Sequence, residues 1–83
     1  MEKTIYTPEQ LGAALKSYRK TKGVSQTEAG INVGLLQKTV SALEIDTSKS
    51  SVDSLFKLIS ALNLELVLRP KGVEVDETTD AEW

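Results

Sequence analysis

SQTEAGINVGLLQKTVSALE, residues 25 to 44, is the stretch that decides the fold of this chain. Ser25 and Glu28 have the spacing of a capping box, in which the hydroxyl and the carboxylate each accept a backbone N–H from the other residue. Apolar residues follow one helical turn apart, and then comes Gly34, which can adopt positive φ and end a helix. The first half of the segment therefore predicts a short helix that begins after Ser25 and stops at a glycine turn.

The second half of the segment predicts another helix, with an apolar inner face and a polar outer face. Val40 and Leu43 recur at helical spacing, and we expect Leu36 on the same inner side. Three polar side chains are then left on the outer face, namely Gln37, Lys38 and Ser41. Their donors and acceptors can reach base edges in a DNA major groove. Two helices joined by a tight turn present one helix face to such a groove, so we expect a DNA-binding helix-turn-helix with these base contacts.

The composition limits the other function classes. Eighty-three residues make one small domain, with little room for a large core. The chain has no cysteine and no histidine, which excludes disulfides, the usual zinc ligands and the commonest nucleophiles and general bases. We therefore expect no enzymatic activity, no metal site and no cofactor. The polar N-terminal residues and the lack of a long apolar run predict a soluble protein of the cytoplasm.

The charge is distributed unevenly along the chain. The net charge is −2, yet all 10 lysines and arginines lie within residues 1–73, beside only seven of the 12 acids. Residues 74–83 hold the other five acids and no base. This asymmetry favours a basic body, residues 1–73, that faces nucleic acid, followed by an acidic tail. Phosphate contacts are expected from lysines that flank the groove, and these are Lys20, Lys22 and Lys49.

Two further helices are predicted around the central segment. Thr7 and Pro8 form a strong helix start, and Gly23 should end that helix. Ser50 or Ser51 should cap a last helix over residues 52–62, whose apolar stripe consists of Val52, Leu55, Phe56, Ile59 and Leu62.

A short strand is expected after the last helix, over residues 64–69. Leu64, Leu66 and Leu68 alternate with other residues, as in a strand with one buried face. Such a strand lacks a clear partner within the chain, because residues 4–6 are a very brief candidate. We expect the strand to pair with its copy in a homodimer, with the leucines at the interface and with or without residues 4–6 at each edge.

The helix-turn-helix segment and the stretches on either side of it resemble the lambda-repressor-like, Cro/C1-type helix-turn-helix family, and within it the HipB-like antitoxins of HipA–HipB toxin–antitoxin modules. The likeness includes the opening IYTPEQL (residues 5–11), the segment LELVL (residues 64–68) and the tail that ends in Trp83. The matching motif positions are Gln26, Glu28, Gly34, Gln37, Thr39, Val40, Ser41 and Glu44.

The resemblance implies an all-α, four-helix domain and specific site roles. Gln26 would contact a phosphate from the start of its helix, and Thr39 would lie near the DNA backbone. HipB-like proteins are dimers that repress their own operon, here from a near-palindromic operator, and hold a HipA-like serine/threonine kinase toxin inactive. The flexible acidic tail would engage that partner, with Trp83 as its anchor, or would mark the antitoxin for turnover.

Three positions depart from the family pattern, and alternatives to the antitoxin reading stay open. Ala29 stands where a larger aliphatic residue is common, Gly30 where alanine is common, and Leu36 where a polar capping residue is common. A glycine in the interior of a helix costs about 1 kcal/mol. A stand-alone phage-type regulator without a toxin partner is the main alternative. An interaction protein that has lost DNA binding is another.

Overall fold

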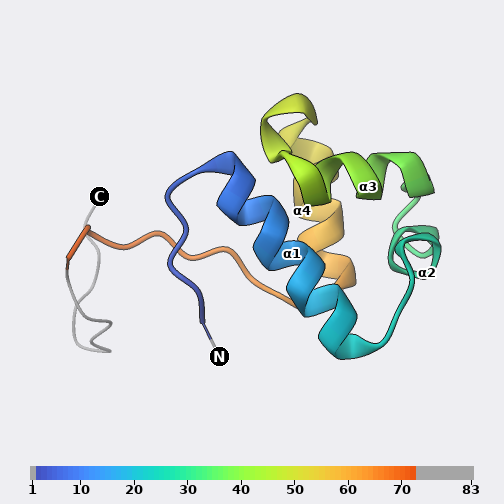
Figure 1. Cartoon of the computed structure of the whole chain (residues 1–83), viewed down its shortest axis with the longest axis horizontal. Coiled ribbons are helices and arrows are strands. Elements are labelled where there is room, and N and C mark those ends of the chain that lie inside the picture. Colours follow the sequence, from blue (N-terminus) through green and yellow to red (C-terminus); the bar gives the residue numbers. More distant parts are fainter. Residues whose placement is uncertain (1, 73–83) are drawn as a thin grey trace.

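Four α-helices form the folded body of the protein in the computed structural model, which describes residues 2–72 (Figure 1). They are α1 (Pro8–Lys22), α2 (Gln26–Ile31), α3 (Gln37–Ile45) and α4 (Val52–Ala61), with a 3₁₀ turn, η1 (Thr47–Lys49), before α4. The expected all-α, four-helix fold is thus confirmed. Within the described residues, no helix is long and apolar enough to cross a membrane.

Both ends of α1 and the start of α2 lie where the sequence predicts them, whereas α2 ends at Ile31, before the predicted stop at Gly34. The Thr7 hydroxyl accepts the N–H of Gln10 at 3.1 Å, and Gly23 ends α1 with a φ of 74°. Ser25 and Glu28 form the capping box of α2: the hydroxyl accepts the Glu28 N–H at 3.0 Å, and the carboxylate accepts the Ser25 N–H at 2.8 Å. Hydrogen bonds therefore fix the entry into each of these helices.

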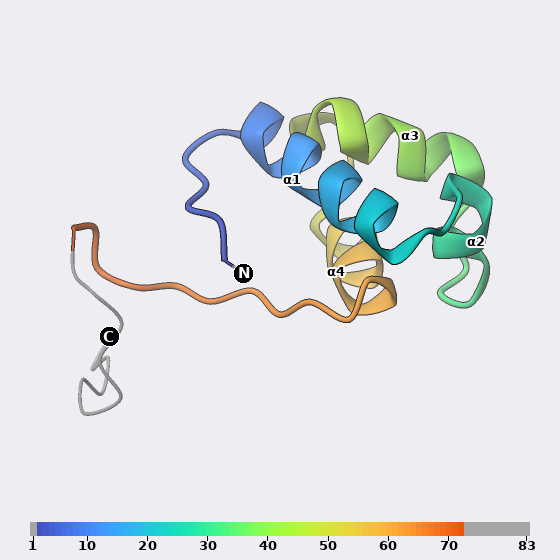
Figure 2. The ribbon, with the colours of Figure 1, turned by 60° about the horizontal axis from the view of Figure 1, so that its bottom comes forward.

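The core lies between α1, α3 and α4, with α2 closing one end (Figure 2). Its largest fully buried side chains come from all three long helices, and they are Leu15, Val40, Leu43 and Leu58. Each such side chain contributes about 1.5–3 kcal/mol by leaving water. Because α3 contributes two of them, its inner face is fixed, and its outer face is fixed with it.

Gly30 permits a close approach that any larger residue would block. A Cβ at this position would lie 2.5 Å from the carbonyl oxygen of Leu35. The carbonyl of Gly30 itself accepts the N–H of Val33 at 3.1 Å and that of Leu35 at 3.0 Å. The propensity cost of this glycine is therefore offset by the tight packing of the turn, which Gly34 completes with a φ of 75°.

Several expected inner residues lie outside the core. Leu36 is 64% exposed, because its neighbour Leu35 takes the inner position instead. Val52 and Phe56 are 68% and 49% exposed, whereas Leu58, which was not in the predicted stripe, is fully buried. The inner stripe of α4 is thus turned from the predicted one, and its members are Leu55, Leu58, Ile59 and Leu62.

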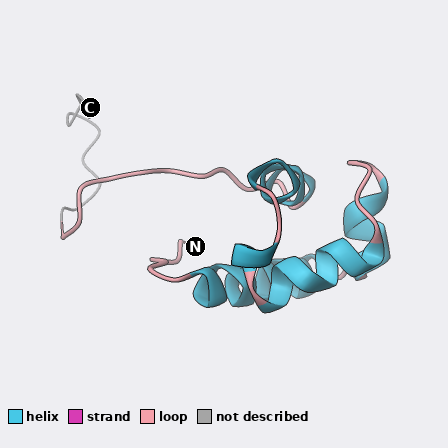
Figure 3. Ribbon diagram, turned by 90° about the horizontal axis from the view of Figure 1, so that it is seen from above, coloured by secondary structure: helices cyan, strands magenta, loops and turns pink. Residues whose placement is uncertain are grey.

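Residues after α4 leave the helical body as an extended segment without a strand partner (Figure 3). Asn63 turns the chain with a φ of 58°, and Leu64 packs against the core. Leu66 and Leu68 are 49% and 80% exposed. Within residues 2–72 no strand forms, because a lone extended segment lacks an edge with which to pair. The strand over residues 64–69 stays a prediction, because it requires a second copy of the chain with which to pair.

The two terminal segments of the described chain meet through side chains only. Arg69 lies 3.3 Å from the carboxylate of Glu2, and the ammonium of Lys71 lies 5.3 Å from the centre of the Tyr6 ring. No backbone hydrogen bond joins residues 2–6 to residues 63–72. The tail over residues 74–83, including Trp83, lies outside the described residues.

Candidate nucleic-acid interface

The outer face of α3 carries the polar residues that the sequence predicts for base contact. Gln37 and Lys38 are exposed, and Ser41 is half-buried. Thr39, expected near the DNA backbone, is also half-buried. The opposite face holds Val40 in the core. The helix therefore presents its N-terminal polar residues outward, which is the geometry that recognition helices use in a major groove.

A buried ion pair joins α3 to α1. The guanidinium of Arg19 on α1 donates through Nε to Oε2 of Glu44 at 2.5 Å and through Nη2 to Oε1 at 3.1 Å. The two side chains are only 10% and 2% exposed. A third hydrogen bond runs from Nη1 to the carbonyl of Val24 at 2.8 Å. The Glu44 hydrogen bond raises the pKa of Arg19, against the opposing effect of burial.

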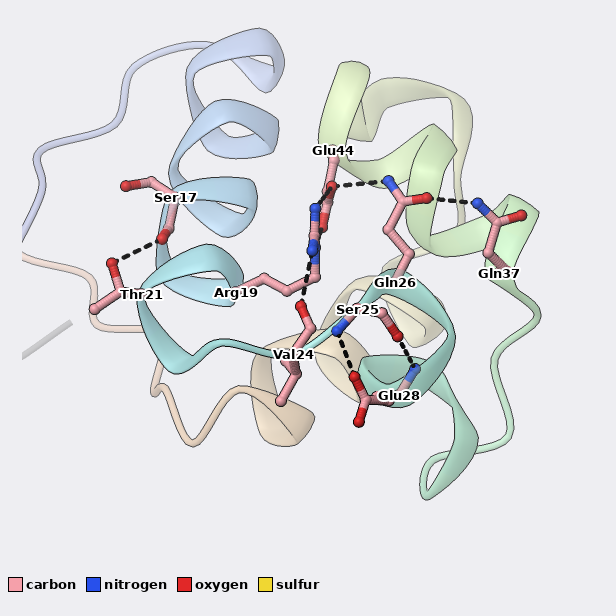
Figure 4. A network of polar contacts seen from close by, with 9 residues as sticks. All are labelled: Ser17, Arg19, Thr21, Val24, Ser25, Gln26, Glu28, Gln37 and Glu44. Carbon is pink, nitrogen blue, oxygen red and sulfur yellow. Dashed lines mark hydrogen bonds and ion pairs between the residues drawn. The ribbon is translucent and has the colours of Figure 1, made fainter.

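The ion pair continues outward as a chain of amides (Figure 4). Gln26 donates from Nε2 to Oε1 of Glu44 at 3.0 Å. Gln37 in turn donates from Nε2 to Oε1 of Gln26 at 2.5 Å. These hydrogen bonds connect α1, α2 and α3, and they extend from the interior to the exposed start of α3 through Arg19, Glu44, Gln26 and Gln37.

This chain has a fixed direction. An ionised carboxylate only accepts hydrogen bonds, so the amide nitrogen of Gln26 must face Glu44. Its oxygen then faces Gln37, which must present its own nitrogen to that oxygen. Gln37 keeps one N–H and its carbonyl oxygen free. A free donor beside a free acceptor is the pattern that pairs with N7 and N6 of adenine.

The expected phosphate contacts have different surroundings. Both polar atoms of the Gln26 side chain already hold hydrogen bonds within the protein, so this residue positions Gln37 as well as standing at the first turn of α2. Lys20 and Lys22 are exposed on the last turn of α1, without a salt bridge within the described residues. Lys49 is exposed in η1 beside Asp46. The structure brings Gln26 and Gln37 together but joins none of these lysines to α3 through a hydrogen bond.

The pairing of Arg19 with Glu44 is a feature of the site that was not predicted from the sequence. The sequence alone marks Glu44 as a position that matches the family and gives Arg19 no particular role. A signal was present, because Arg19 lies one turn after Leu15 on the apolar face and Glu44 directly follows the buried Leu43. In the part of the chain that the structure describes, no three His, Cys, Asp or Glu side chains gather in a way that could hold a metal ion.

Comparison with known proteins places the chain in a family. A helix-turn-helix family model matches residues 15–68. The antitoxin HipB of Escherichia coli O6:H1 (strain CFT073) is 33% identical over 82 residues, which cover 95% of this chain and 87% of that protein. A HipA–HipB–O2–O3 complex contains a chain that superposes with a TM-score of 0.80 at 30% identity, over 84% of this chain and 99% of that one. The chain of a HipB–O4 20mer complex gives the same TM-score, identity and coverage. This protein therefore belongs to the helix-turn-helix family, as a relative of the HipB antitoxins.

Proposed function

We propose that this protein binds operator DNA as the repressor of its own operon and serves as the antitoxin of a HipA-like kinase. One observation carries the DNA-binding part: the amide of Gln37 is exposed, at the start of α3, and held in one orientation through Gln26 by the buried Glu44. Preorganised polar groups of this kind lose little entropy when they meet a base. The resolved HipB–O4 20mer complex, formed by a relative of the same fold, supports the assignment.

In the mechanism, the base contacts and the phosphate contacts have separate tasks. Gln37, Lys38 and Ser41 discriminate between bases, with Gln37 directed at adenine and Lys38 at guanine. Thr39 and the exposed Lys20, Lys22 and Lys49 contact phosphates, as does the first turn of α2 at Gln26. Each phosphate neutralised releases counterions, so the affinity falls steeply as salt rises.

Two copies of the domain are needed for a full site. A homodimer places its recognition helices about 34 Å apart on one face of the duplex, and the operator is then near-palindromic. The unpaired segment over residues 64–69 supplies the contact between copies, with Leu66 and Leu68 covered across the two-fold axis. Domain organisation follows: residues 1–73 bind DNA and dimerise, and residues 74–83 form an acidic tail.

The antitoxin role rests on the family and on the tail. A HipA–HipB–O2–O3 complex has been solved for a relative that this chain matches over 84% of its length. We assign residues 74–83 to the same kind of partner, with Trp83 as the apolar anchor and the carboxylates against a basic rim. The protein then acts in the cytoplasm, without catalysis of its own. Co-purification of a HipA-like kinase from the native operon supports this role; a dimer that elutes alone favours the stand-alone regulator.

Gel shifts on the DNA upstream of its own gene test the repressor role. The double variant Gln37→Ala, Lys38→Ala should lose operator preference over unrelated DNA while it remains a dimer in sedimentation. Lys57→Ala, on α4 in an exposed ion pair with Asp53, is the matched control for charge and should keep that preference. A footprint that stays unchanged in the double variant would contradict the assignment of α3.

A further inference from the structure

Two adjacent leucines before α3 point in opposite directions. Leu35 packs against the core, and its N–H is fixed at 3.0 Å from the carbonyl of Gly30. Leu36 follows in extended backbone, with φ −73° and ψ 152°, and its side chain is 64% exposed. Successive side chains of an extended segment lie on opposite sides, so the burial of Leu35 turns Leu36 outward.

Leu36 also stands at the N-cap of the recognition helix, where it makes no side-chain hydrogen bond. Its carbonyl accepts the N–H of Thr39 at 3.0 Å and that of Val40 at 3.1 Å, which fixes the backbone. Ser, Thr, Asp or Asn at this position would satisfy an N–H of the first turn. The protein thus forgoes a helix cap and exposes a large apolar side chain directly beside Gln37. Neither feature favours folding, which points to a contact outside the chain.

We propose that Leu36 reads a thymine methyl group in the major groove. This inference rests on the proposed DNA binding and deepens it. Residues at the N-terminal end of a recognition helix reach base edges, and the C5-methyl of thymine is the apolar group that the groove offers. Gln37, the next residue, keeps a donor and an acceptor free for adenine, so the pair Leu36–Gln37 selects an A·T-containing step. Leu36 is then a specificity residue that carries no charge and makes no hydrogen bond.

Replacement of thymine by deoxyuridine tests this directly, because it removes one methyl group and leaves base pairing unchanged. The full-length protein is titrated against its operator duplex, with each thymine replaced singly by deoxyuridine. We expect one thymine in each half-site at which binding weakens about four-fold, the worth of one buried methyl-sized group. Leu36→Ala should weaken binding to the unmodified operator by a similar factor and should be insensitive to deoxyuridine at that one position.

A second variant separates base reading from a structural role. Leu36→Ser introduces the missing helix cap, so it should raise the melting temperature and yet bind the thymine operator more weakly. Ile31→Ala is the matched control, since Ile31 is 69% exposed at the end of α2 and should keep the full deoxyuridine effect. Equal sensitivity of the native protein and Leu36→Ala at every thymine would overturn the proposal and leave the repressor role intact. Failure of the native protein to bind any fragment of its promoter would overturn both.

Discussion

Arg19 and Glu44, 25 residues apart in the chain, face each other through two hydrogen bonds in the interior between α1 and α3. Glu44 also accepts a hydrogen bond from Gln26, so one carboxylate serves both the packing of the helices and, through Gln26, the orientation of Gln37. Within residues 2–72 every buried side-chain nitrogen and oxygen has a hydrogen-bond partner. A buried pair with all its hydrogen bonds made is tolerated, but the loss of either member leaves an uncompensated charge.

Glu44→Ala should therefore destabilise the protein by about 3–5 kcal/mol, because the guanidinium of Arg19 stays buried without its carboxylate. Urea unfolding followed by circular dichroism measures the change. The control is Asp53→Ala, which breaks the exposed pair with Lys57 and should shift stability by no more than about 1 kcal/mol. Equal losses of unfolding free energy in the two variants would show that the buried pair stabilises the protein no more than the exposed pair does.

Gln26→Ala should impair base discrimination more than it impairs folding. The substitution removes the link between Glu44 and Gln37 and frees the Gln37 amide to rotate. We expect the preference for the operator's adenine over other bases at that position to fall by part of the roughly 1–3 kcal/mol that a bidentate contact supplies. Competition binding with single-base operator variants measures this ratio. Thr27→Ala, exposed on the same helix, is the control, and an unaltered ratio in Gln26→Ala would refute the positioning role.

Residue patterns predict the elements of this fold better than the contacts between them. The caps at Thr7 and Ser25 could be predicted because a cap depends on neighbours three residues away. The burial of Arg19 and of Glu44 could be inferred from the apolar residues beside them, but their pairing could not, since it depends on how α1 crosses α3. The same holds for Leu36, whose helical spacing suggested burial, although the extended backbone at the cap turns it outward. Outer-face residues of α3 were predictable because Val40 and Leu43 fix the inner face.

Gly30→Ala should destabilise the protein, although alanine is the better helix former by about 1 kcal/mol. The added Cβ would lie 2.5 Å from the Leu35 carbonyl oxygen and 3.2 Å from a methyl carbon of Val40. Relief requires the turn between α2 and α3 to shift, and such overpacking typically costs about 1–3 kcal/mol. The melting temperature of Gly30→Ala measures the change, with Thr27→Ala on the same helix as the control. A variant as stable as the native protein would mean that the turn can move without cost.

Acid should weaken the start of α2 through Glu28. The hydrogen bonds with the Ser25 backbone and hydroxyl lower the pKa of Glu28 from its ordinary value of 4.5. A lowered pKa in the folded state means that the stabilisation is present above pH 4.5 and is lost as the pH falls through the folded pKa. Glu28→Gln keeps an acceptor oxygen but cannot titrate. Its melting temperature should fall less than that of the native protein between about pH 5 and about pH 3.

Part of the acid sensitivity should persist in Glu28→Gln. The Ser48 side chain and backbone lower the pKa of Asp46 in the same direction, with a contribution from Lys49. Asp46→Asn combined with Glu28→Gln should therefore give the flattest pH profile of the three proteins. Parallel profiles for the native protein and both variants would contradict the role of the two carboxylates.

Leu66→Asp should convert the proposed dimer into monomers that bind operator DNA weakly. Leu64 is anchored on the core of its own chain, whereas Leu66 and Leu68 lie exposed on an extended segment with unpaired backbone groups. A second copy of this segment can satisfy the backbone and cover both leucines, and a charge at position 66 would then be buried between the copies. Val67→Asp is the matched control, since Val67 alternates with the leucines and should face away from that interface. Sedimentation velocity distinguishes the two variants. A dimer that survives Leu66→Asp would show that the copies meet elsewhere, because a carboxylate buried without a partner between two paired strands is strongly unfavourable.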